Sequence, residues 1–367
     1  MGRRTNTAAW YETQKRWQIK VQKNGERRTF TSSTLGRNGQ RECNGKADAW
    51  LDNHIIEPNI RASRVFNNWM EELKGTTSRG HWSLYQSYWD NWFRGILGNL
   101  KVESITEQHI QDIINNAFKR GNLSRKTLQN MRGCLTAFIK YCRKRKSTAL
   151  VVENVYIPRG AKAGERKILQ PIDLKVLFTN DMMKLKGREV VAPYINAFRF
   201  EVTTGLRPGE VLGLKWGDLE DNVVKIRRSI NKYNEQTKGK NENAVRDFAL
   251  KPIDIESIIS QKKYILASGI RSEYVFPDRY GEHAKQRNYL KHWAKYKDHN
   301  GLGEVSLYEL RHTFISINKE LPAGLIKEVV GHGVNMDTYG TYGHVVNGEM
   351  QRTAELIQKQ FEKALEG

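Results

Sequence analysis

A short basic segment around Pro158, Gly160 and Gly164 interrupts the chain near its middle and divides it into halves of different charge. Residues 1–165 carry 29 basic and 14 acidic residues, a net charge of +15, whereas residues 166–367 carry 32 and 26, a net charge of +6. The chain of 367 residues also exceeds the size at which a single hydrophobic core usually stops growing. We therefore expect several domains, with the more basic ones before the interruption.

The total net charge of +21 favours a polyanionic partner, with nucleic acid as the leading candidate and an anionic membrane as the alternative. Hydrophobic residues make up 38% of the chain, which is enough to build folded cores. No stretch approaches the roughly 20 apolar residues of a membrane span, and the first ten residues lack the apolar core of a signal peptide. We expect a folded, cytoplasmic protein that makes no membrane contact.

The three cysteines indicate neither a disulfide framework nor a structural metal. Cys43, Cys134 and Cys142 form no CxxC pair and no cluster with the spacing of a zinc site. Cys134 and Cys142 are eight residues apart on one helical stripe, so we expect both thiols to lie in a core.

Residues 1–57 are predicted to form a small basic domain of a sheet plus one helix. Alternating segments at 16–21 and 28–31 flank Asn24-Gly25, and Asn-Gly between such segments is a strong hairpin signal. Apolar residues between 45 and 56 recur at helical spacing. A basic sheet of this kind is suited to a DNA groove. The candidate DNA contacts here are Lys20, Lys23, Arg27 and Arg28.

Residues 61–155 are predicted to form a bundle of four short helices, with Thr106 as the N-cap of the third. Residues 119–146 contain ten Lys or Arg and no Asp or Glu. A helix face that is merely soluble normally mixes charges of both signs, so we expect phosphate contacts here; a solvated face is the alternative. The candidate contacts are Arg125, Lys126, Arg132 and Lys140.

Residues 156–167 are predicted to be a linker, and residues 168–367 a further domain that is mainly helical with one β-rich patch at 222–250. Within it, an apolar helix is followed by a break at Gly205 and a second helix. Gly205 permits the turn that would place Arg207 near the start of that helix with its guanidinium pointing inward. A packing contact between Arg207 and Glu210 is the alternative interpretation.

Four motifs in this domain follow a known order. Residues 204–211, with Trp216 and Asp218 downstream, resemble the first arginine motif of the tyrosine recombinases, the phage integrase family. Residues 307–314 resemble the second motif, residues 330–333 the third, and residues 342–345 the segment that carries the nucleophilic tyrosine. The resemblance covers roughly residues 168–348, and the two front domains match in size, charge and order.

The resemblance implies a multidomain, mainly α fold. The expected parts are a small N-terminal β-sheet plus helix domain that binds arm-type DNA sites, a four-helix SAM-like core-binding domain, and a mixed α/β (mainly α) catalytic domain that breaks and rejoins DNA.

Cleavage of a phosphodiester without a metal requires cations for the phosphate oxygens, a nucleophile and an acid for the leaving oxygen. Arg207 and Arg311 can form the clamp, because guanidinium groups bind phosphate bidentately and stay charged. The resemblance implies that Tyr342 attacks to form a 3′-phosphotyrosyl link, and that neither a metal nor a cofactor takes part. Tyr342 lies ten residues after His332, and Tyr339 is the competing candidate.

The resemblance also implies a lysine on a β-hairpin as the proton donor. Lys240 lies six residues before Arg246, which matches the family's spacing, and Lys238 is the alternative.

Tyr308 stands where the family most often has histidine. Tyrosine donates hydrogen bonds but, with a reference pKa of about 10, is a poor base at neutral pH. His332 is then the better candidate base for Tyr342, unless the arginines alone activate the phenol. His312 is a possible displaced substitute.

A stripe of apolar residues ends the chain, at Met350, Ala354, Ile357, Phe361 and Leu365. In related recombinases such a helix docks on a neighbouring protomer, and packing on its own chain is the alternative. The resemblance implies a homotetramer on double-stranded DNA, held by this helix, with accessory DNA-bending and excision factors as further partners.

The predicted function is that of a site-specific integrase, which integrates and excises a mobile element and acts in a bacterial host at the nucleoid. A type IB topoisomerase is one alternative, although the basic N-terminal sheet argues against it. A DNA-binding regulator that no longer cleaves is another, because of Tyr308.

Overall fold

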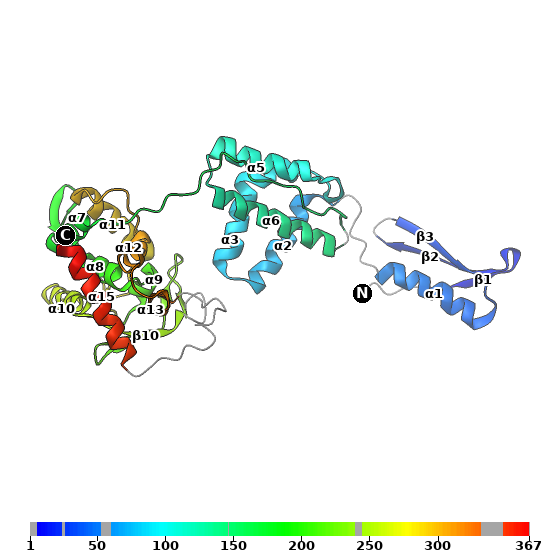
Figure 1. Cartoon of the computed structure of the whole chain (residues 1–367). Coiled ribbons are helices and arrows are strands. Elements are labelled where there is room, and N and C mark those ends of the chain that lie inside the picture. Colours follow the sequence, from blue (N-terminus) through cyan, green and yellow to red (C-terminus); the bar gives the residue numbers. More distant parts are fainter. Residues whose placement is uncertain are drawn as a thin grey trace. The chain divides into compact units, whose positions relative to one another are not determined.

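The computed structural model describes residues 6–23, 26–52, 60–145, 147–238, 244–331 and 348–366. The chain forms two compact units, residues 1–164 and 165–367, shown in Figure 1. Lys240, His332, Tyr339 and Tyr342 lie outside the described residues. None of the described helices is both long and apolar enough to cross a membrane.

The elements of the first unit are β1 (Ala9–Tyr11), η1 (Glu12–Gln14), β2 (Arg16–Lys23), β3 (Glu26–Ser32), α1 (Gly36–Asp52), α2 (Ala62–Thr76), α3 (Arg79–Tyr88), the π-helical η2 (Trp89–Phe93), α4 (Arg94–Leu97), η3 (Val102–Ser104), α5 (Glu107–Gly121) and α6 (Arg125–Lys144).

Two separate hydrophobic cores lie within this unit. The first joins α1 to the antiparallel sheet β1-β2-β3 through residues such as Ile19, Val21 and Trp50. The hairpin prediction is confirmed by pairing from Trp17↔Ser32 to Lys23↔Glu26. The predicted helix begins earlier than expected, at Gly36, and β1 was not foreseen.

The second core is formed by the helices from α2 through α6. Thr106 caps α5 as predicted, since its side-chain oxygen accepts a hydrogen bond from the backbone nitrogen of His109. Cys134 and Cys142 are fully buried in this core, as expected. Ala161 also packs into it, and the backbone nitrogen of Arg125 donates to the carbonyl of Lys162 at 2.9 Å. The first part of the predicted linker, 156–162, therefore packs on the helices rather than hanging free.

The elements of the second unit are α7 (Pro171–Thr179), β4 (Met182–Leu185), β5 (Arg188–Val191), α8 (Ile195–Thr204), α9 (Pro208–Gly213), η4 (Trp216–Asp218), β6 (Leu219–Glu220), β7 (Val223–Ile226), β8 (Ser229–Ile230), β9 (Gln236–Thr237), β10 (Arg246–Ala249), α10 (Pro252–Ala267), α11 (Gln286–Asn300), α12 (Glu309–Ile317), α13 (Ala323–Val330) and α15 (Glu349–Glu366).

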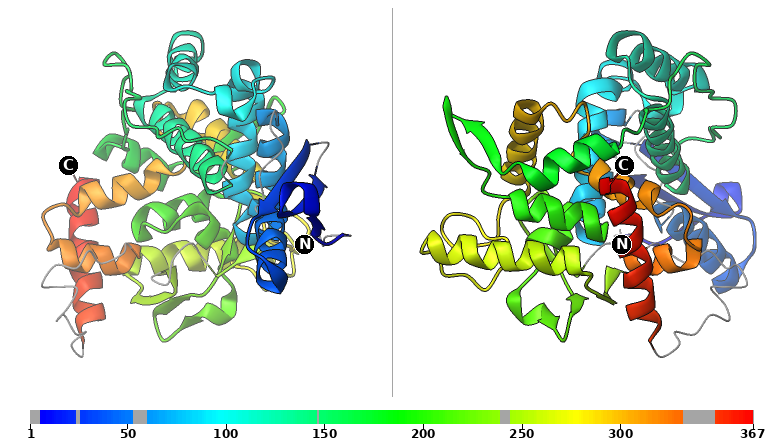
Figure 2. Two further views of the ribbon diagram at one scale, coloured as in Figure 1. Left: turned by 90° about the vertical axis from the view of Figure 1, so that its right-hand side faces the viewer. Right: turned by 60° about the vertical axis from the view of Figure 1, so that its left-hand side comes forward.

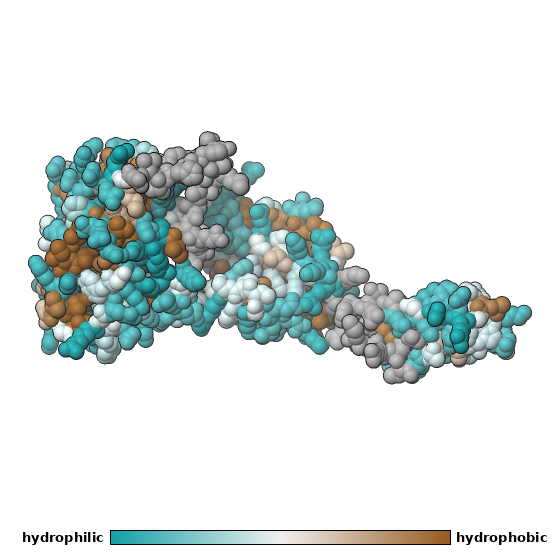
Figure 3. Space-filling model, turned by 90° about the horizontal axis from the view of Figure 1, so that it is seen from below, coloured by the Kyte–Doolittle hydropathy of each residue, from teal (hydrophilic) through white to brown (hydrophobic). Residues whose placement is uncertain are grey.

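Helix α8 lies at the centre of this unit. Nine of its residues are buried, and it contacts α7, α9, α10 and α12. The antiparallel sheet β10-β7-β6 forms the β-rich patch that the sequence predicted, whereas the hairpin β4-β5 was not foreseen. On the face shown in Figure 3, hydrophilic residues cover most of the described surface.

Helix α15 buries its apolar stripe against its own unit, where it contacts α7, β10 and α12 (Figure 2). Ile357 and Phe361 belong to the core of that unit, and the Phe361 ring lies 6.2 Å from that of Phe314. Packing on the same chain, the alternative that the sequence offered, is thus the arrangement of this helix in the single chain.

We expect Phe361→Ala to lower the free energy of unfolding of this unit by about 3–5 kcal/mol, because it empties a buried aromatic site. Met350→Ala, at a partly exposed position of the same helix, is the matched control and should cost less than about 1 kcal/mol. Urea unfolding of dilute, monomeric protein measures both. If Phe361→Ala had no cost in the monomer, α15 would not pack on its own chain in solution.

Candidate active site

Local sequence places Arg207 at the start of α9. Gly205 ends α8 with a φ of 64°, and a Cβ at this position would lie 2.5 Å from the ring of Phe314. Pro208 then occupies the first turn of α9, where its fixed φ suits a helix start. Arg207 is the N-cap residue, so its side chain leaves the helix end toward the interior, as the sequence predicted.

Glu210 binds two arginines at once. It is only 2% exposed, and Arg207 Nη1 donates to its Oε1 at 2.7 Å. Arg246, the first residue of β10, donates from Nη2 to Oε2 at 3.0 Å. The backbone nitrogen of Arg207 also donates to Oε2, which closes a capping box. The pairing of Arg207 with Glu210, which the sequence offered as the alternative interpretation, is therefore present, and the same carboxylate also aligns Arg246.

Two further contacts extend this network to the third motif. Arg246 Nε donates to the carbonyl of Val329 at 2.7 Å, and Arg207 Nη2 donates to the carbonyl of Gly331 at 3.3 Å. Gly331 directly precedes His332. The end of α13 is therefore fixed against α9 and β10 by two arginine side chains.

Arg311 supplies the remaining cation of the cluster. It is 1% exposed on α12, and its Nη1 donates to the carbonyl of Gly205 at 2.7 Å. Its Nη2 has no hydrogen-bond partner among the described residues. Burial, followed by the charge of Arg207, lowers the pKa of Arg311 to about 10, so the guanidinium is charged at neutral pH.

The cluster carries excess positive charge. Burial alone would raise the pKa of Glu210, but the charges and hydrogen bonds of Arg246 and Arg207 hold that pKa below its usual value. One carboxylate therefore faces the three guanidiniums of Arg207, Arg246 and Arg311. Such an arrangement suits an anionic group with several acceptor oxygens, such as a phosphate.

Tyr308 and His312 lie next to Arg311 at the beginning of α12. Tyr308 is 47% exposed, and its ring meets that of His312 edge to face, with centroids 5.6 Å apart. Burial, followed by the charge of Arg166, lowers the pKa of His312, which is therefore neutral at pH 7. The side chain of Tyr308 therefore reaches solvent beside Arg311.

The structure does not test the roles of Lys240, His332 and Tyr342, which lie outside the described residues. Lys238, the alternative to Lys240, is exposed just before that gap. In the part of the chain that the structure describes, no group of three or more His, Cys, Asp or Glu side chains is placed to hold a metal ion.

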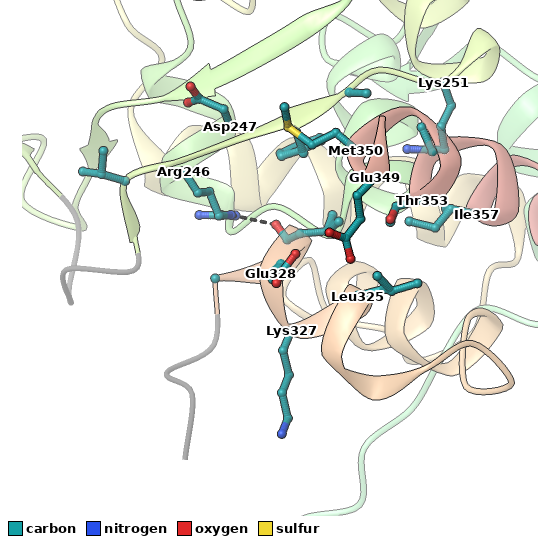
Figure 4. Close-up of a pocket in the computed structure, with 16 residues that line it drawn as sticks. Arg246, Asp247, Lys251, Leu325, Lys327, Glu328, Glu349, Met350, Thr353 and Ile357 are labelled. Carbon is teal, nitrogen blue, oxygen red and sulfur yellow. Dashed lines mark hydrogen bonds between the residues drawn. The ribbon is translucent and has the colours of Figure 1, made fainter. Parts of the chain in front are cut away.

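A pocket of about 400 Å³ borders the cluster, between β10, α13 and α15 (Figure 4). Its walls include Phe248, Leu325, Met350 and Ile357, and Arg246 contributes to one side. Gly331 and Glu349 also line it. Both residues belong to the described parts of the chain that border residues 332–347 in the sequence.

The predicted DNA contacts of the N-terminal sheet lie on two different faces. Lys20 pairs with Thr29 and Arg27 with Gln22 in the register, so Lys20 and Arg27 point away from α1. Arg28 pairs with the buried Val21, and its guanidinium lies 5.6 Å from the centre of the Trp50 ring on α1. Lys23 ends β2 opposite Glu26. Lys20 and Arg27 are thus the pair that shares the open face of the sheet.

On α6, Arg125, Lys126 and Lys140 are exposed. Arg132 is exposed as well, but its Nη1 donates to the carbonyl of Val155 at 3.0 Å. That contact holds the segment after α6 against the helix, so Arg132 has a structural role that the charge run alone did not reveal.

An arginine cluster of this kind in a mainly helical domain suits an anionic ligand such as a phosphate. The model of the "Phage integrase family" matches residues 182–349, and that of the "Phage integrase, N-terminal SAM-like domain" matches residues 63–118. The chain belongs to the phage integrase family, the tyrosine recombinases, and is a tyrosine site-specific recombinase. The predicted fold class is confirmed as well.

Relatives and solved structures agree with this assignment. The chain is similar to the "Tyrosine recombinase XerC-like" protein of Caldanaerobacter subterraneus subsp. tengcongensis, with 22% identity over 92% of this chain and 98% of that protein. The integrase of transposon Tn1549 in complex with circular intermediate DNA has a TM-score of 0.61 at 15% identity, over 80% of this chain and 98% of that chain. A lambda integrase dimer bound to a COC′ core site has a TM-score of 0.57 at 15% identity, over 95% and 99%. The structural likenesses show a shared fold.

We expect Glu210→Gln to lower the free energy of unfolding by about 3–5 kcal/mol at pH 7, because it leaves two buried guanidiniums without their carboxylate. The pKa of Glu210 lies below its usual value of 4.5 in the folded chain. The contribution of its charge is therefore complete above that usual value and is lost as the pH falls through the folded pKa. Urea unfolding of both proteins from pH 7 to pH 3 should show the difference shrinking, and a constant difference would contradict an ionised Glu210.

Proposed function

We propose that this recombinase cleaves and rejoins DNA at specific sites through a 3′-phosphotyrosyl intermediate, and thereby integrates and excises a mobile element. The arginine cluster is the observation that carries the proposal. Arg311 donates to a backbone carbonyl at the α8-α9 break, and Arg207 donates to one at the end of α13. Arg311 Nη2 has no hydrogen-bond partner among the described residues. Guanidiniums held in this way are ready to bind the non-bridging oxygens of a phosphodiester.

In the proposed reaction the Tyr342 oxygen attacks the phosphorus, and the bond from phosphorus to the 5′ oxygen breaks. Lys240 gives a proton to that leaving oxygen, and His332 accepts the proton of Tyr342. Tyr308 donates a hydrogen bond to a phosphate oxygen. Attack of a 5′ hydroxyl on the phosphotyrosine reverses these steps and rejoins the strand, so the bond energy is conserved without a cofactor.

The described residues on either side of the stretch that carries Tyr342 support this assignment. Gly331 contacts Arg207, and Glu349 lines the same pocket as Arg246. Tyr339 belongs to the same segment and is therefore the matched control for Tyr342.

The partner that we propose is double-stranded DNA, with core sites bound by the helical core-binding domain and arm sites by residues 1–57. The Tn1549 and lambda integrase structures contain DNA, and one lambda structure is a tetramer on a Holliday junction. We propose a tetramer here too, together with accessory bending and excision factors, in the cytoplasm of a bacterial host. Because α15 packs on its own unit, assembly through that helix would require its exchange between protomers.

We expect the full chain to form a covalent adduct with a nicked duplex that carries the DNA sequence flanking its gene. Tyr342→Phe should form no adduct, whereas Tyr339→Phe should still form it. Arg311→Ala should bind the duplex but form adduct about 10²–10³-fold more slowly, because it loses one donor to the phosphate. Denaturing gels and filter binding measure the two quantities. Adduct formation by Tyr342→Phe would disprove the nucleophile, and equal losses in binding and cleavage would contradict the role of Arg311.

We expect the double change Lys126→Ala and Lys140→Ala to reduce the slope of log K against log salt by about 0.9 for each phosphate contact that is lost. Both side chains are exposed on α6. Lys74→Ala is the matched control, since its ammonium already pairs with Glu71 at 2.7 Å. Binding isotherms at several salt concentrations give the slopes. If the double variant kept the wild-type slope, the basic run on α6 would be a solvated face.

A further inference from the structure

Glu201, in the middle of α8, lies behind the arginine cluster and has no part in the mechanism described above. It is 0% exposed. The Tyr289 hydroxyl on α11 donates to Glu201 Oε2 at 2.8 Å, and Oε1 has no hydrogen-bond partner among the described residues. A fully buried carboxylate normally needs an ion pair or several donors to offset its lost hydration. With a single donor, the surroundings of Glu201 favour the neutral acid.

Glu201 is joined to Arg311 through the backbone. The nitrogen of Gly205 donates to the carbonyl of Glu201 at 2.9 Å, and the carbonyl of Gly205 accepts from Arg311 Nη1 at 2.7 Å. The carboxyl group and the guanidinium are close enough to interact electrostatically. An ionised Glu201 would therefore offset part of the charge that Arg311 presents to a phosphate.

The charged and titratable groups that act on Glu201 are Tyr289 on α11, Glu210 on α9 and Arg311 on α12. Helix α10 meets α8 with the uncharged Gln261, and α7 buries only leucines. Burial raises the pKa of Glu201 well above its usual value, and Glu210 acts in the same direction. The hydrogen bond from Tyr289 and the charge of Arg311 oppose the shift without reversing it.

We propose that Glu201 is a positioning residue that stays a neutral carboxylic acid at pH 7 and so leaves the charge of Arg311 available to the DNA phosphate. Its catalytic consequence rests on the proposed function. The two buried glutamates then act in opposite ways: Glu210 is ionised and aligns Arg207, whereas Glu201 is neutral and adds no second negative charge. Ionisation of Glu201 in alkaline solution would weaken the clamp.

The first test needs no DNA and compares the thermal midpoints of wild type and Glu201→Gln from pH 5 to pH 8. Glu201 has a raised pKa in the folded chain, so its contribution to stability is complete below its unfolded pKa and is lost as the pH rises. Wherever Glu201 is neutral in the folded chain and ionised in the unfolded chain, the midpoint of wild type should fall relative to Glu201→Gln by about 3 °C per pH unit. A difference that stays constant across this range would overturn the proposal. Glu210→Gln, at the ionised glutamate, is the matched control and should show a constant difference.

The second test compares adduct formation by wild type and Glu201→Gln on the nicked duplex from pH 6 to pH 9.5. We expect the ratio of the variant's rate to the wild-type rate to lie within about threefold of one at pH 6. This ratio should not fall as the pH rises, because only wild type has a carboxyl group at residue 201 that can ionise. A variant that is folded but tenfold slower at pH 6 would overturn the proposal. Glu210→Gln should instead be at least 100-fold slower at every pH, because Arg207 loses its alignment.

A second variant covers the case in which Glu201→Gln does not fold. Tyr289→Phe removes the single donor to the carboxyl group of Glu201, which raises the pKa of that group further. The stability of this variant should therefore keep falling with rising pH up to a higher pH than the stability of wild type does. A fall that ends at a lower pH in Tyr289→Phe would overturn the proposal. If wild type forms no adduct at all, the proposed function fails, while the measurements without DNA still decide the charge of Glu201.

Discussion

The ion pairs of Glu210 are the interaction on which the catalytic unit depends. One carboxylate caps α9 through the backbone nitrogen of Arg207, fixes the Arg207 guanidinium and receives Arg246 from β10. Arg246 in turn holds the carbonyl of Val329 on α13. A helix start, a strand start and a helix end are thus joined at one buried group, so a change there would disturb all three elements together.

Burial of this cluster lowers the stability of the fold and also favours the binding of an anion. Three guanidiniums face one ionised carboxylate, and burial, followed by repulsion from Arg207 and Arg246, lowers the pKa of Arg311. The folded chain tolerates that repulsion because hydrophobic packing around α8 supplies stability elsewhere. A bound phosphate would relieve this repulsion and would gain affinity from doing so.

Local signals in the sequence predicted the parts of the site that depend on neighbouring residues. Gly205 and Pro208 mark the helix break that places Arg207 at the start of α9, and Thr106 marks the start of α5. The sequence did not predict the features that depend on tertiary packing, because no local pattern of residues indicates them. The second arginine on Glu210 comes from 36 residues away, and the burial of Glu201 results from the packing of several helices around α8. The structural contact of Arg132 with Val155 was hidden within a run of similar charges.

The distribution of charge separates two ranges of electrostatic action. The net charge of +15 on residues 1–165 acts over distances up to a Debye length of roughly 10 Å, and salt weakens it. In the cluster Arg311 is buried and Arg207 and Arg246 are only partly exposed, so that screening by salt is weaker there and geometry decides the interaction. Residues 166–367 can therefore be almost balanced, at +6, without losing the local field that a phosphate would meet. In the function that we propose, attraction of a polyanion and chemistry on one of its phosphates are therefore tasks of different residues, and only the second depends on the fold of the α8-α9 break.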